Sequence, residues 1–352
     1  MRDVAEIKAR HLAFWERGPA TRPLGTCWIG SRYPGELFPA ASAIPTGRVL
    51  PGHIDVQSFM PDYERLYELH ESTDDDAFWV ASPLFGIPWN EAILGCPVYY
   101  SGESFWVEPI ISDWHARPKL PLPEGEAWLA KLLEFTESLV RLAAGRHPVG
   151  TTLMRGPADL LAAVRGHVEM VYDLYDHPEQ VQSMIDELTD VWLAVARMQL
   201  DRIPPFAGGY AVHFYRAWAP DRIALTQEDA SASFSPDTYR RFLLAADRRI
   251  AAGLPYSVMH VHGTAIWPVE QMLGIEELSC IEINYDDNAP RLPELLPTLR
   301  RIQASKPLII RGSFTDDEIA YVKRELSPCG LLLNIVVSSV AEARQLMDAL
   351  RR

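Results

Sequence analysis

The 352 residues are enough for one large domain or two of ordinary size. With 48% hydrophobic and 23% charged residues, the composition is that of a soluble globular protein. The formal net charge of -14 argues against nucleic acid or an anionic membrane as a partner, because both attract basic surfaces. No apolar run reaches the roughly 18 residues of a membrane span. The charged N-terminus does not resemble a signal peptide, so we expect a cytoplasmic protein.

The N-terminal third predicts helices and loops around two short buried strands. Gly and Pro are frequent in the long loop between them, and a loop of that length is usually functional. The predicted elements, in order, are a helix at 3–17, a strand at 25–30, a loop at 31–60, a helix at 61–72, a strand at 77–82 and an excursion with a hairpin at 83–110.

Further along the chain, apolar strands alternate with helices. The predicted strands lie at 148–154, 209–215, 256–262, 279–286, 307–313 and 330–337, and helices lie at 125–145, 157–203, 235–252, 265–274, 291–303, 315–326 and 339–351. Strands that are apolar on both faces and joined by helices indicate a parallel sheet.

Eight such strands predict an α/β fold, a (β/α)8 TIM barrel. We expect a single domain over 1–352, with an N-terminal helical extension and the hairpin excursion after the second strand. A doubly wound sheet is the alternative, but no glycine-rich dinucleotide fingerprint follows any strand.

The fifth predicted strand ends in His260-Val261-His262. Side chains two residues apart on a strand point to the same face, so the two imidazoles project together. They could bind one metal ion, or they could be two hydrogen-bonded core histidines. If Glu282 on the sixth strand faces the same interior, it lies near His260 and completes a ligand set for zinc or another divalent metal.

Barrel enzymes carry their active sites at the C-terminal ends of the strands. Polar residues gather there in this sequence, although about half of any such set would be expected only to cap or bridge loops. The set comprises Arg32, Asn90 or Glu91, Arg155, His213, Tyr215, Arg216, His260, His262, Asp286, Arg311 and Asn334. Its arginines would suit a carboxylate or another anion.

Several motifs, in this order along the chain, resemble the uroporphyrinogen decarboxylase superfamily. They are residues 156–166, 174–179, 214–219, 227–231 with Ser235-Pro236, 260–263 and 310–313. The superfamily has the (β/α)8 fold and includes zinc-dependent corrinoid and coenzyme M methyltransferases. The resemblance implies methyl transfer or decarboxylation as the chemistry, and a corrinoid protein as a partner.

The departures from the superfamily bear on function. The decarboxylases have a catalytic aspartate after the second strand, where this chain has Ser82, and an acid where it has Arg216. The methyltransferases bind zinc with a His-x-Cys pair, which here is His260 and His262, and with a later cysteine that falls near Val337. A carboxylate such as Glu282 or Glu91 would have to replace that thiolate.

We therefore predict a metal-dependent methyl or small alkyl transferase, or a demethylase, acting on a small anionic molecule. The predicted residues are metal ligands His260, His262 and Glu282, catalytic residues Arg216, Asp229, Glu282, His213 and Tyr215, and substrate-binding residues Arg32, Arg155, Arg311, Asn334 and Asp286. A second copy of the chain is a further candidate partner. The alternatives are a metal-free decarboxylase or lyase and a non-catalytic binding protein.

Overall fold

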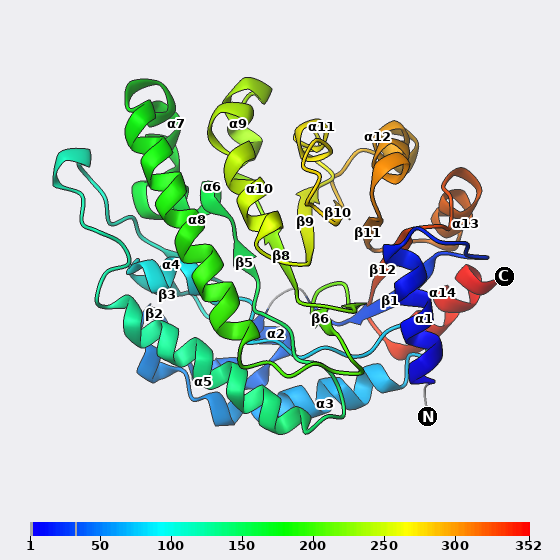
Figure 1. Cartoon of the computed structure of the whole chain (residues 1–352). Helices are drawn as coiled ribbons and strands as arrows, with labels where there is room; N and C mark the ends of the chain where they lie inside the picture. The colour runs from blue at the N-terminus through cyan, green and yellow to red at the C-terminus, as the bar shows by residue number, and fades with distance from the viewer. Residues whose placement is uncertain (1–2, 32–33) are drawn as a thin grey trace.

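A parallel sheet forms the centre of the computed structural model, which describes residues 3–31 and 34–352 (Figure 1). Within these residues, seven strands pair in the order β1-β12-β11-β10-β9-β8-β5. Their bounds are β1 Leu24–Ile29, β5 Met154–Arg155, β8 Ile223–Gln227, β9 Tyr256–His262, β10 Cys280–Tyr285, β11 Leu308–Gly312 and β12 Leu331–Val337. Every one of these neighbours pairs in parallel. The architecture is α/β and consistent with a TIM-barrel-like fold, as the sequence predicts.

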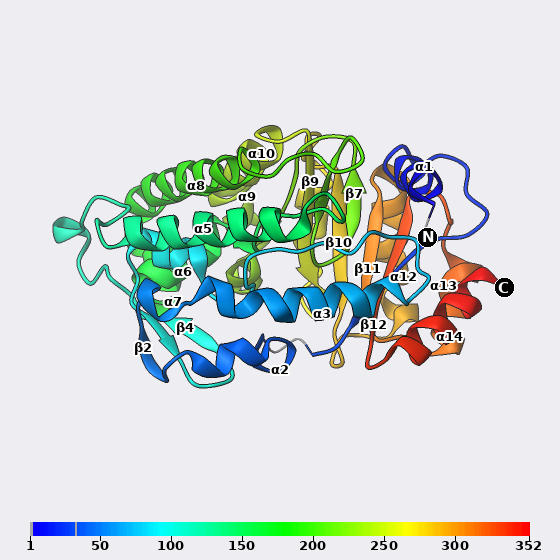
Figure 2. The same ribbon diagram turned by 90° about the horizontal axis from the view of Figure 1, so that it is seen from below.

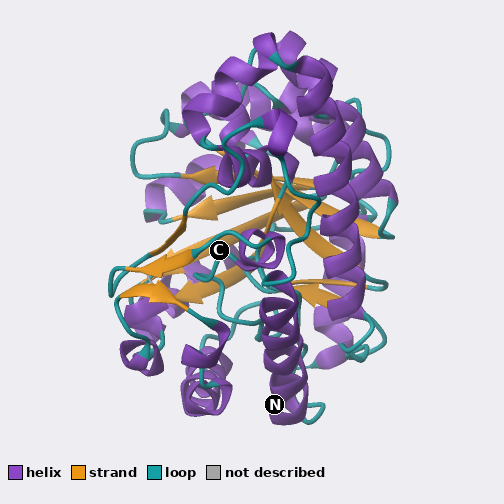
Figure 3. Cartoon of the chain, turned by 90° about the vertical axis from the view of Figure 1, so that its left-hand side faces the viewer, coloured by secondary structure: helices purple, strands orange, loops and turns teal. Residues whose placement is uncertain are grey.

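Helices lie on both sides of the strands (Figure 3). They are α1 Val4–Trp15, α2 Pro34–Leu37, α3 Met60–Glu71, α4 Trp89–Leu94, α5 Gly125–Ala143, α6 Pro157–Arg165, α7 His167–Asp176, α8 Pro178–Leu200, α9 Pro236–Phe242, α10 Leu244–Ala252, α11 Val269–Met272, α12 Leu292–Ser305, α13 Asp316–Glu325 and α14 Val340–Arg351. Viewed from below, α3 and α5 run alongside each other, and α1 and α14 lie on the same side of the molecule (Figure 2). None of the helices described here is both long and apolar enough to cross a membrane.

The second predicted strand, 77–82, is not a regular strand. It makes an isolated parallel bridge between Ala81 and Val149. The carbonyls of Ala77 and Phe78 instead accept hydrogen bonds from the Arg216 guanidinium, at 3.2 and 3.0 Å. These two carbonyls are therefore not available for hydrogen bonds to a neighbouring strand, and the segment is irregular. The third predicted strand, 148–154, is also shorter than predicted, because the two-residue β5 includes only Met154 from that range.

The fourth strand was predicted at the wrong place. Within 209–215 the structure has β6 (Tyr210–Val212), which turns back to pair antiparallel with β7 (Ala217–Ala219). Arg216, at the end of that turn, has a φ of 54°, a left-handed conformation that reverses the chain. The strand that joins the central sheet is β8, which follows the hairpin and is buried along its whole length. The sequence predicts no strand at 223–227.

The predicted hairpin after residue 83 is confirmed. It consists of β3 (Val98–Tyr100) and β4 (Phe105–Val107), which pair antiparallel, and β2 (Gly47–Val49) from the preceding loop adds a third strand. The loop at 31–60 also contains α2 and three short 3-10 helices at 39–43, 51–53 and 56–59. This long loop is therefore folded against the sheet region rather than extended.

The interior of the sheet changes from apolar to polar toward the C-terminal ends of the strands. Alternate residues near the strand starts pack into one cluster with Phe14 and Trp15 of α1. Those strand residues are Leu24, Leu225, Val258, Cys280, Ile309 and Leu332. Two residues further along, the strand register aligns Gln227, His260 and Glu282 in one row. A second row aligns Thr26, Asn334, Arg311, Asn284 and His262. Because every second residue of a strand faces the interior, these polar side chains gather near the C-terminal ends of the strands.

His11 connects α1 to two other parts of the chain. Its ring Nδ1 accepts a hydrogen bond from the backbone N–H of Trp218 at 3.1 Å, so Nε2 carries the proton and donates to the carbonyl of Asp76 at 3.1 Å. Burial lowers the pKa of His11 from 6.5 to about 4. Protonation of Nδ1 would remove the acceptor of the Trp218 N–H, which is a second reason why the neutral ring is favoured in the fold.

His11 should make folding stability dependent on pH. Its folded pKa lies below its unfolded pKa, so its contribution is complete above pH 6.5 and is lost as the pH falls toward 4, by about 3 kcal/mol. In His11→Asn, the free energy of unfolding from urea titrations should fall less steeply between pH 7 and pH 4.5 than in the wild type. His115→Asn, at an exposed position, is the control. Equal slopes in His11→Asn and wild type would contradict this role.

Candidate functional site

His260 and His262 project from β9 to the same side, as the sequence predicts. Their ring centroids lie 4.7 Å apart. The residues between and before them, Val261 and Met259, face the opposite way and pack in the core cluster beneath the helices. The strand alternation thus separates two histidines that face the interior from apolar residues that anchor the strand.

Each histidine is oriented by a carboxylate on β10 or just after it. His260 Nδ1 lies 2.5 Å from Glu282 Oε2, which also accepts a hydrogen bond from the Tyr215 hydroxyl at 2.9 Å. His262 Nδ1 lies 2.9 Å from Asp286 Oδ2, and Asn284 donates to the other oxygen of Asp286. The Nδ1 atoms are therefore engaged, and both Nε2 atoms are the ones directed toward Asp229.

Asp229 completes a group of three potential metal ligands. It begins the short 3-10 helix η5 (Asp229–Ser233) that directly follows β8. Its oxygens lie 3.6 Å from His262 Nε2 and 4.0 Å from His260 Nε2. One donor atom from each of the three residues lies within 4.8 Å of the others. Gln227 orients the carboxylate with a hydrogen bond of 2.6 Å, and a cavity of about 100 Å³ opens on the group.

The three carboxylates around the histidines shift the pKa values of the group. Hydrogen bonds to Asp229 and Asp286 raise the pKa of His262 to about 10. Burial alone would lower the pKa of His260, but the adjacent Glu282 carboxylate outweighs it and the pKa is raised. Burial would raise the pKa of Asp229, but the hydrogen bond to His262 outweighs it and the pKa is lowered. The cluster therefore favours positive charge at its centre.

A larger cavity of about 290 Å³ adjoins the histidines through Asp286. Arg311 lies in its wall, donates to Asn284 at 3.3 Å and stacks over the rings of Trp28 and Phe214 at 5.7 and 5.8 Å. The described lining residues are Ser31, Glu36, Asn284, Tyr285, Asp286, Asp287, Arg311, Gly312, Ser313 and Val336. Two predicted substrate-binding residues, Arg311 and Asp286, are thus brought to one cavity.

The other predicted substrate-binding residues that the structure describes, Arg155 and Asn334, do not line this cavity. Arg155, at the end of β5, pairs with the buried Glu91 at 2.9 Å. Asn334 is fully buried in the same row of the register as Arg311 and donates to Thr26 Oγ1 at 2.8 Å. Arg32 lies outside the residues that the structure describes. The predicted catalytic residue His213 packs edge-on against Trp28, and burial lowers its pKa to about 3, so its ring is neutral.

Arg216 lies in the packing between the β6–β7 hairpin, β1 and the segment at 75–78. Its side chain is 2% exposed and forms an ion pair with Asp75, which is fully buried. Its remaining hydrogen bonds go to backbone carbonyls, including that of Cys27 at 2.7 Å. The geometry therefore gives Arg216 a structural role in place of the catalytic role predicted from the sequence.

Asp229, not Glu282, is the carboxylate that faces the two Nε2 atoms. Glu282 was predicted as a ligand, but its Oε2 is held by His260 Nδ1 and Tyr215, behind the imidazole. Asp229 was predicted as a catalytic residue and not as a ligand. The sequence contained a signal for its position, because Ile223-Ala224-Leu225-Thr226-Gln227 is an uninterrupted run without charge that ends two residues before it. Recognition of that run as a strand would have placed Asp229 beside β9.

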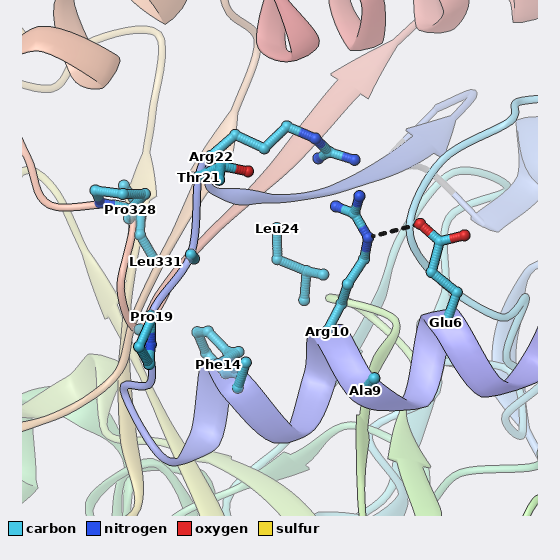
Figure 4. Close-up of a pocket in the computed structure, with 13 residues that line it drawn as sticks. Glu6, Ala9, Arg10, Phe14, Pro19, Thr21, Arg22, Leu24, Pro328 and Leu331 are labelled. Atoms are coloured by element: carbon cyan, nitrogen blue, oxygen red, sulfur yellow. Dashed lines mark hydrogen bonds and ion pairs between the residues drawn. The ribbon is translucent and has the colours of Figure 1, made fainter.

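A separate cavity of about 340 Å³ lies at the opposite end of the strands, between α1, the start of β1 and the start of β12 (Figure 4). Its arginines are already paired: Arg10 contacts Glu6 at 3.2 Å, and Arg22 contacts Asp76 at 2.5 Å. Among the described residues that line it, none belongs to the predicted site. The candidate site is therefore the histidine group at the C-terminal ends of the strands.

Replacement of Arg216 should reduce stability strongly. Arg216→Met leaves the Asp75 carboxylate buried without its charge partner, so the free energy of unfolding should fall by about 3–5 kcal/mol. Urea unfolding followed by circular dichroism would measure the loss. Arg240→Met, at a residue whose ion pair with Asp237 is at the surface, should change stability by no more than about 0.5 kcal/mol. A loss of similar size in both variants would contradict the structural role.

Comparisons with known proteins support the fold. No protein-family model matches the chain, and no curated protein sequence matches it. Among solved structures, a methyltransferase from Methanosarcina mazei is similar, with a TM-score of 0.66 and 14% sequence identity over 98% of each chain. At this identity the similarity concerns the fold alone. The chain therefore shares the methyltransferase-like fold of that protein over nearly its whole length.

Proposed function

We propose that the chain is a metal-dependent enzyme that transfers a methyl or other small alkyl group. The observation that carries the proposal is the convergence of His260 Nε2, His262 Nε2 and an Asp229 oxygen, with donor atoms from all three within 4.8 Å of one another. Two imidazoles and one carboxylate are a common ligand set for catalytic divalent metals, which keep a further position open for substrate.

The distances fit a single ion. Bonds of about 2.1 Å at tetrahedral angles place donor atoms roughly 3.4 Å apart. One oxygen of Asp229 lies 3.6 Å from His262 Nε2 and the other lies 4.0 Å from His260 Nε2, so these two contacts would have to shorten by about 0.2 and 0.6 Å to reach that spacing. The carboxylates of Glu282 and Asp286 contact the Nδ1 atoms behind the rings, as carboxylates do that orient histidines whose Nε2 binds a metal.

The charges also fit a divalent cation. Asp229, Glu282 and Asp286 bring three negative charges to two imidazoles. A doubly charged ion would offset most of that charge and replace the proton now favoured on His262. Zinc is one candidate, and the harder oxygen-containing ligand set admits other first-row metals. When bound, such an ion supplies a Lewis acid that lowers the pKa of a coordinated nucleophile.

The adjoining cavity suggests the kind of substrate. Among its described lining residues Arg311 is the cation, while Glu36, Asp286 and Asp287 are acidic. This lining favours a small molecule with at most one anionic group, which Arg311 would bind. In the transfer, the donor keeps the electron pair of its bond to the methyl carbon. The acceptor forms the new bond to that carbon and releases its proton.

The shared fold with a methyltransferase from Methanosarcina mazei is in keeping with methyl transfer. We also propose a divergent relationship to the uroporphyrinogen decarboxylase superfamily, with a corrinoid protein as partner and a homodimer as the assembly. The same proposal makes residues 1–352 one domain. In this domain the barrel would close between β1 and β5 through the segment at 76–82. The Asp76 N–H donates to the Gly25 carbonyl, and the Gly150 N–H donates to the Ala81 carbonyl.

A second candidate function is a metal-free decarboxylase or lyase. One observation favours it: Asp229 and Asp286 flank His262 and hold its pKa near 10, so its imidazolium could donate a proton to a carbanion left by loss of a carboxylate. Activity that survives removal of metal by a chelator would favour this second function over the first.

Metal binding should depend on the three converging residues. Calorimetric titration of chelator-treated wild type with Zn²⁺ should give about one equivalent per chain. Asp229→Ala and His260→Ala should each lose affinity by at least about 100-fold, because each removes a ligand. Glu282→Gln should lose about 10–100-fold, since it keeps the ligands but weakens the orientation of His260.

His115→Ala is the matched control, because this histidine is exposed and lies outside the group. It should bind zinc as the wild type does. Circular dichroism should show each variant folded. A folded wild type that binds none of zinc, cobalt, iron or manganese would rule the metal proposal out.

A further inference from the structure

Two crossed hydrogen bonds tie the Asp229 loop to the start of α6. The N–H of Ala158 donates to Glu228 Oε2 at 2.8 Å, and the N–H of Ala230 donates to Asp159 Oδ1 at 2.6 Å. Each donor is the second residue of its helix, α6 or η5, where the backbone N–H has no partner within the helix. Each helix therefore receives its cap from the other. We call this pair of bonds the crossed caps.

The crossed caps fix the residues on both sides of Asp229. Glu228 precedes Asp229 and contributes one carboxylate, while Ala230 follows it and contributes one N–H. With both neighbours held, the backbone of Asp229 has little freedom to rotate. Gln227 then orients the side chain itself through its 2.6 Å hydrogen bond.

Gly156 allows the two segments to approach this closely. Its N–H donates to the carbonyl of Gln227 at 2.8 Å. A Cβ at this position would lie 2.1 Å from Glu228 Oε1 and 2.5 Å from the Gln227 carbonyl oxygen. Gly156 has a φ of -82°, so alanine would be allowed by the backbone and excluded only by contact.

Asp159 acts through these bonds and not on a ligand. It is 9% exposed and is not among the described residues that line the histidine cavity. Its Oδ1 accepts from Ala230, and Oδ2 has no hydrogen-bond partner among the residues described. An asparagine could thus keep the accepted hydrogen bond while losing the charge.

We propose that Asp159 is a positioning residue for Asp229, and that the crossed caps hold the Asp229 carboxylate at the distance from His260 and His262 that a shared metal requires. The part of this proposal that concerns the metal rests on the proposed function. The part that concerns the position of the Asp229 loop does not. Loss of the Asp159 acceptor would free the loop that carries Asp229, and the third ligand would move away from the two imidazoles.

The test combines crystal structures with zinc titration for wild type, Asp159→Ala and Asp159→Asn. Without added metal, Asp159→Ala should move the Asp229 carboxylate more than 1 Å from His262 Nε2, whereas Asp159→Asn should leave it in place. Zinc affinity should fall about 10–100-fold in Asp159→Ala and less than about threefold in Asp159→Asn. Rescue by asparagine would not be expected if Asp159 contributed only its charge.

Gly156→Ala supplies a second route that leaves every side chain of the crossed caps intact. It should displace the loop and weaken zinc binding, whereas Gly52→Ala should not, because a Cβ at Gly52 meets nothing within 4 Å. If Asp159→Ala does not fold, the comparison of Gly156→Ala with Gly52→Ala tests the positioning role instead.

The outcomes separate the two proposals. Tight zinc binding by wild type and equally by Asp159→Ala or Gly156→Ala, with Asp229 unmoved, would overturn the positioning role and leave the metal proposal intact. A displaced Asp229 in those variants, together with a wild type that binds no metal, would support the positioning role and reject the proposed function.

Discussion

The hydrogen bond between His260 and Glu282 joins the two neighbouring strands on which the site depends. Both side chains point into an interior that is otherwise apolar near the strand starts, so each needs a partner there. Their pairing in the strand register makes the contact unavoidable once β9 and β10 lie side by side. It also sets the direction of the imidazole. With Nδ1 directed at the carboxylate, Nε2 must face the cavity and Asp229.

The same principle repeats around the interior. His262 is oriented by Asp286, Asp286 by Asn284, and Asn284 is contacted by Arg311. His262, Asn284 and Arg311 occupy the row next to that of His260, because every second residue of a strand faces the interior, and Asp286 follows the end of β10. The site is therefore a continuous polar network with one face open to two cavities. Most of its members are oriented by, or orient, a neighbouring member through these hydrogen bonds.

The buried ion pair outside the site stabilises the fold. Arg216 and Asp75 form an ion pair in the packing between the hairpin and the first strand, and the guanidinium also occupies the carbonyls of Ala77 and Phe78. This explains why the second predicted strand is irregular. A motif position that holds an acid in the resembled decarboxylases holds here an arginine that supports the fold. A catalytic role assigned to Arg216 from that motif position alone is therefore not supported by its contacts.

The sequence by itself determined the α/β class, most of the later strands and helices, and the common direction of His260 and His262. Those features depend on short-range periodicity, which a sequence displays directly. It also predicted the approach of Glu282 to His260, because both lie on consecutive strands of one parallel sheet. The position of β8 was missed, since an antiparallel hairpin before it, at 210–219, offered an equally apolar strand pattern.

Only the tertiary structure decided which carboxylate faces the Nε2 atoms of His260 and His262. Asp229 and Glu282 are both near the histidines, and the choice depends on which ring nitrogen each one meets. The crossed caps of Asp159 and Glu228 join segments about 70 residues apart, at a distance that Gly156 alone permits. Contacts of this kind arise from the packing of whole elements, and no local pattern in the chain encodes them.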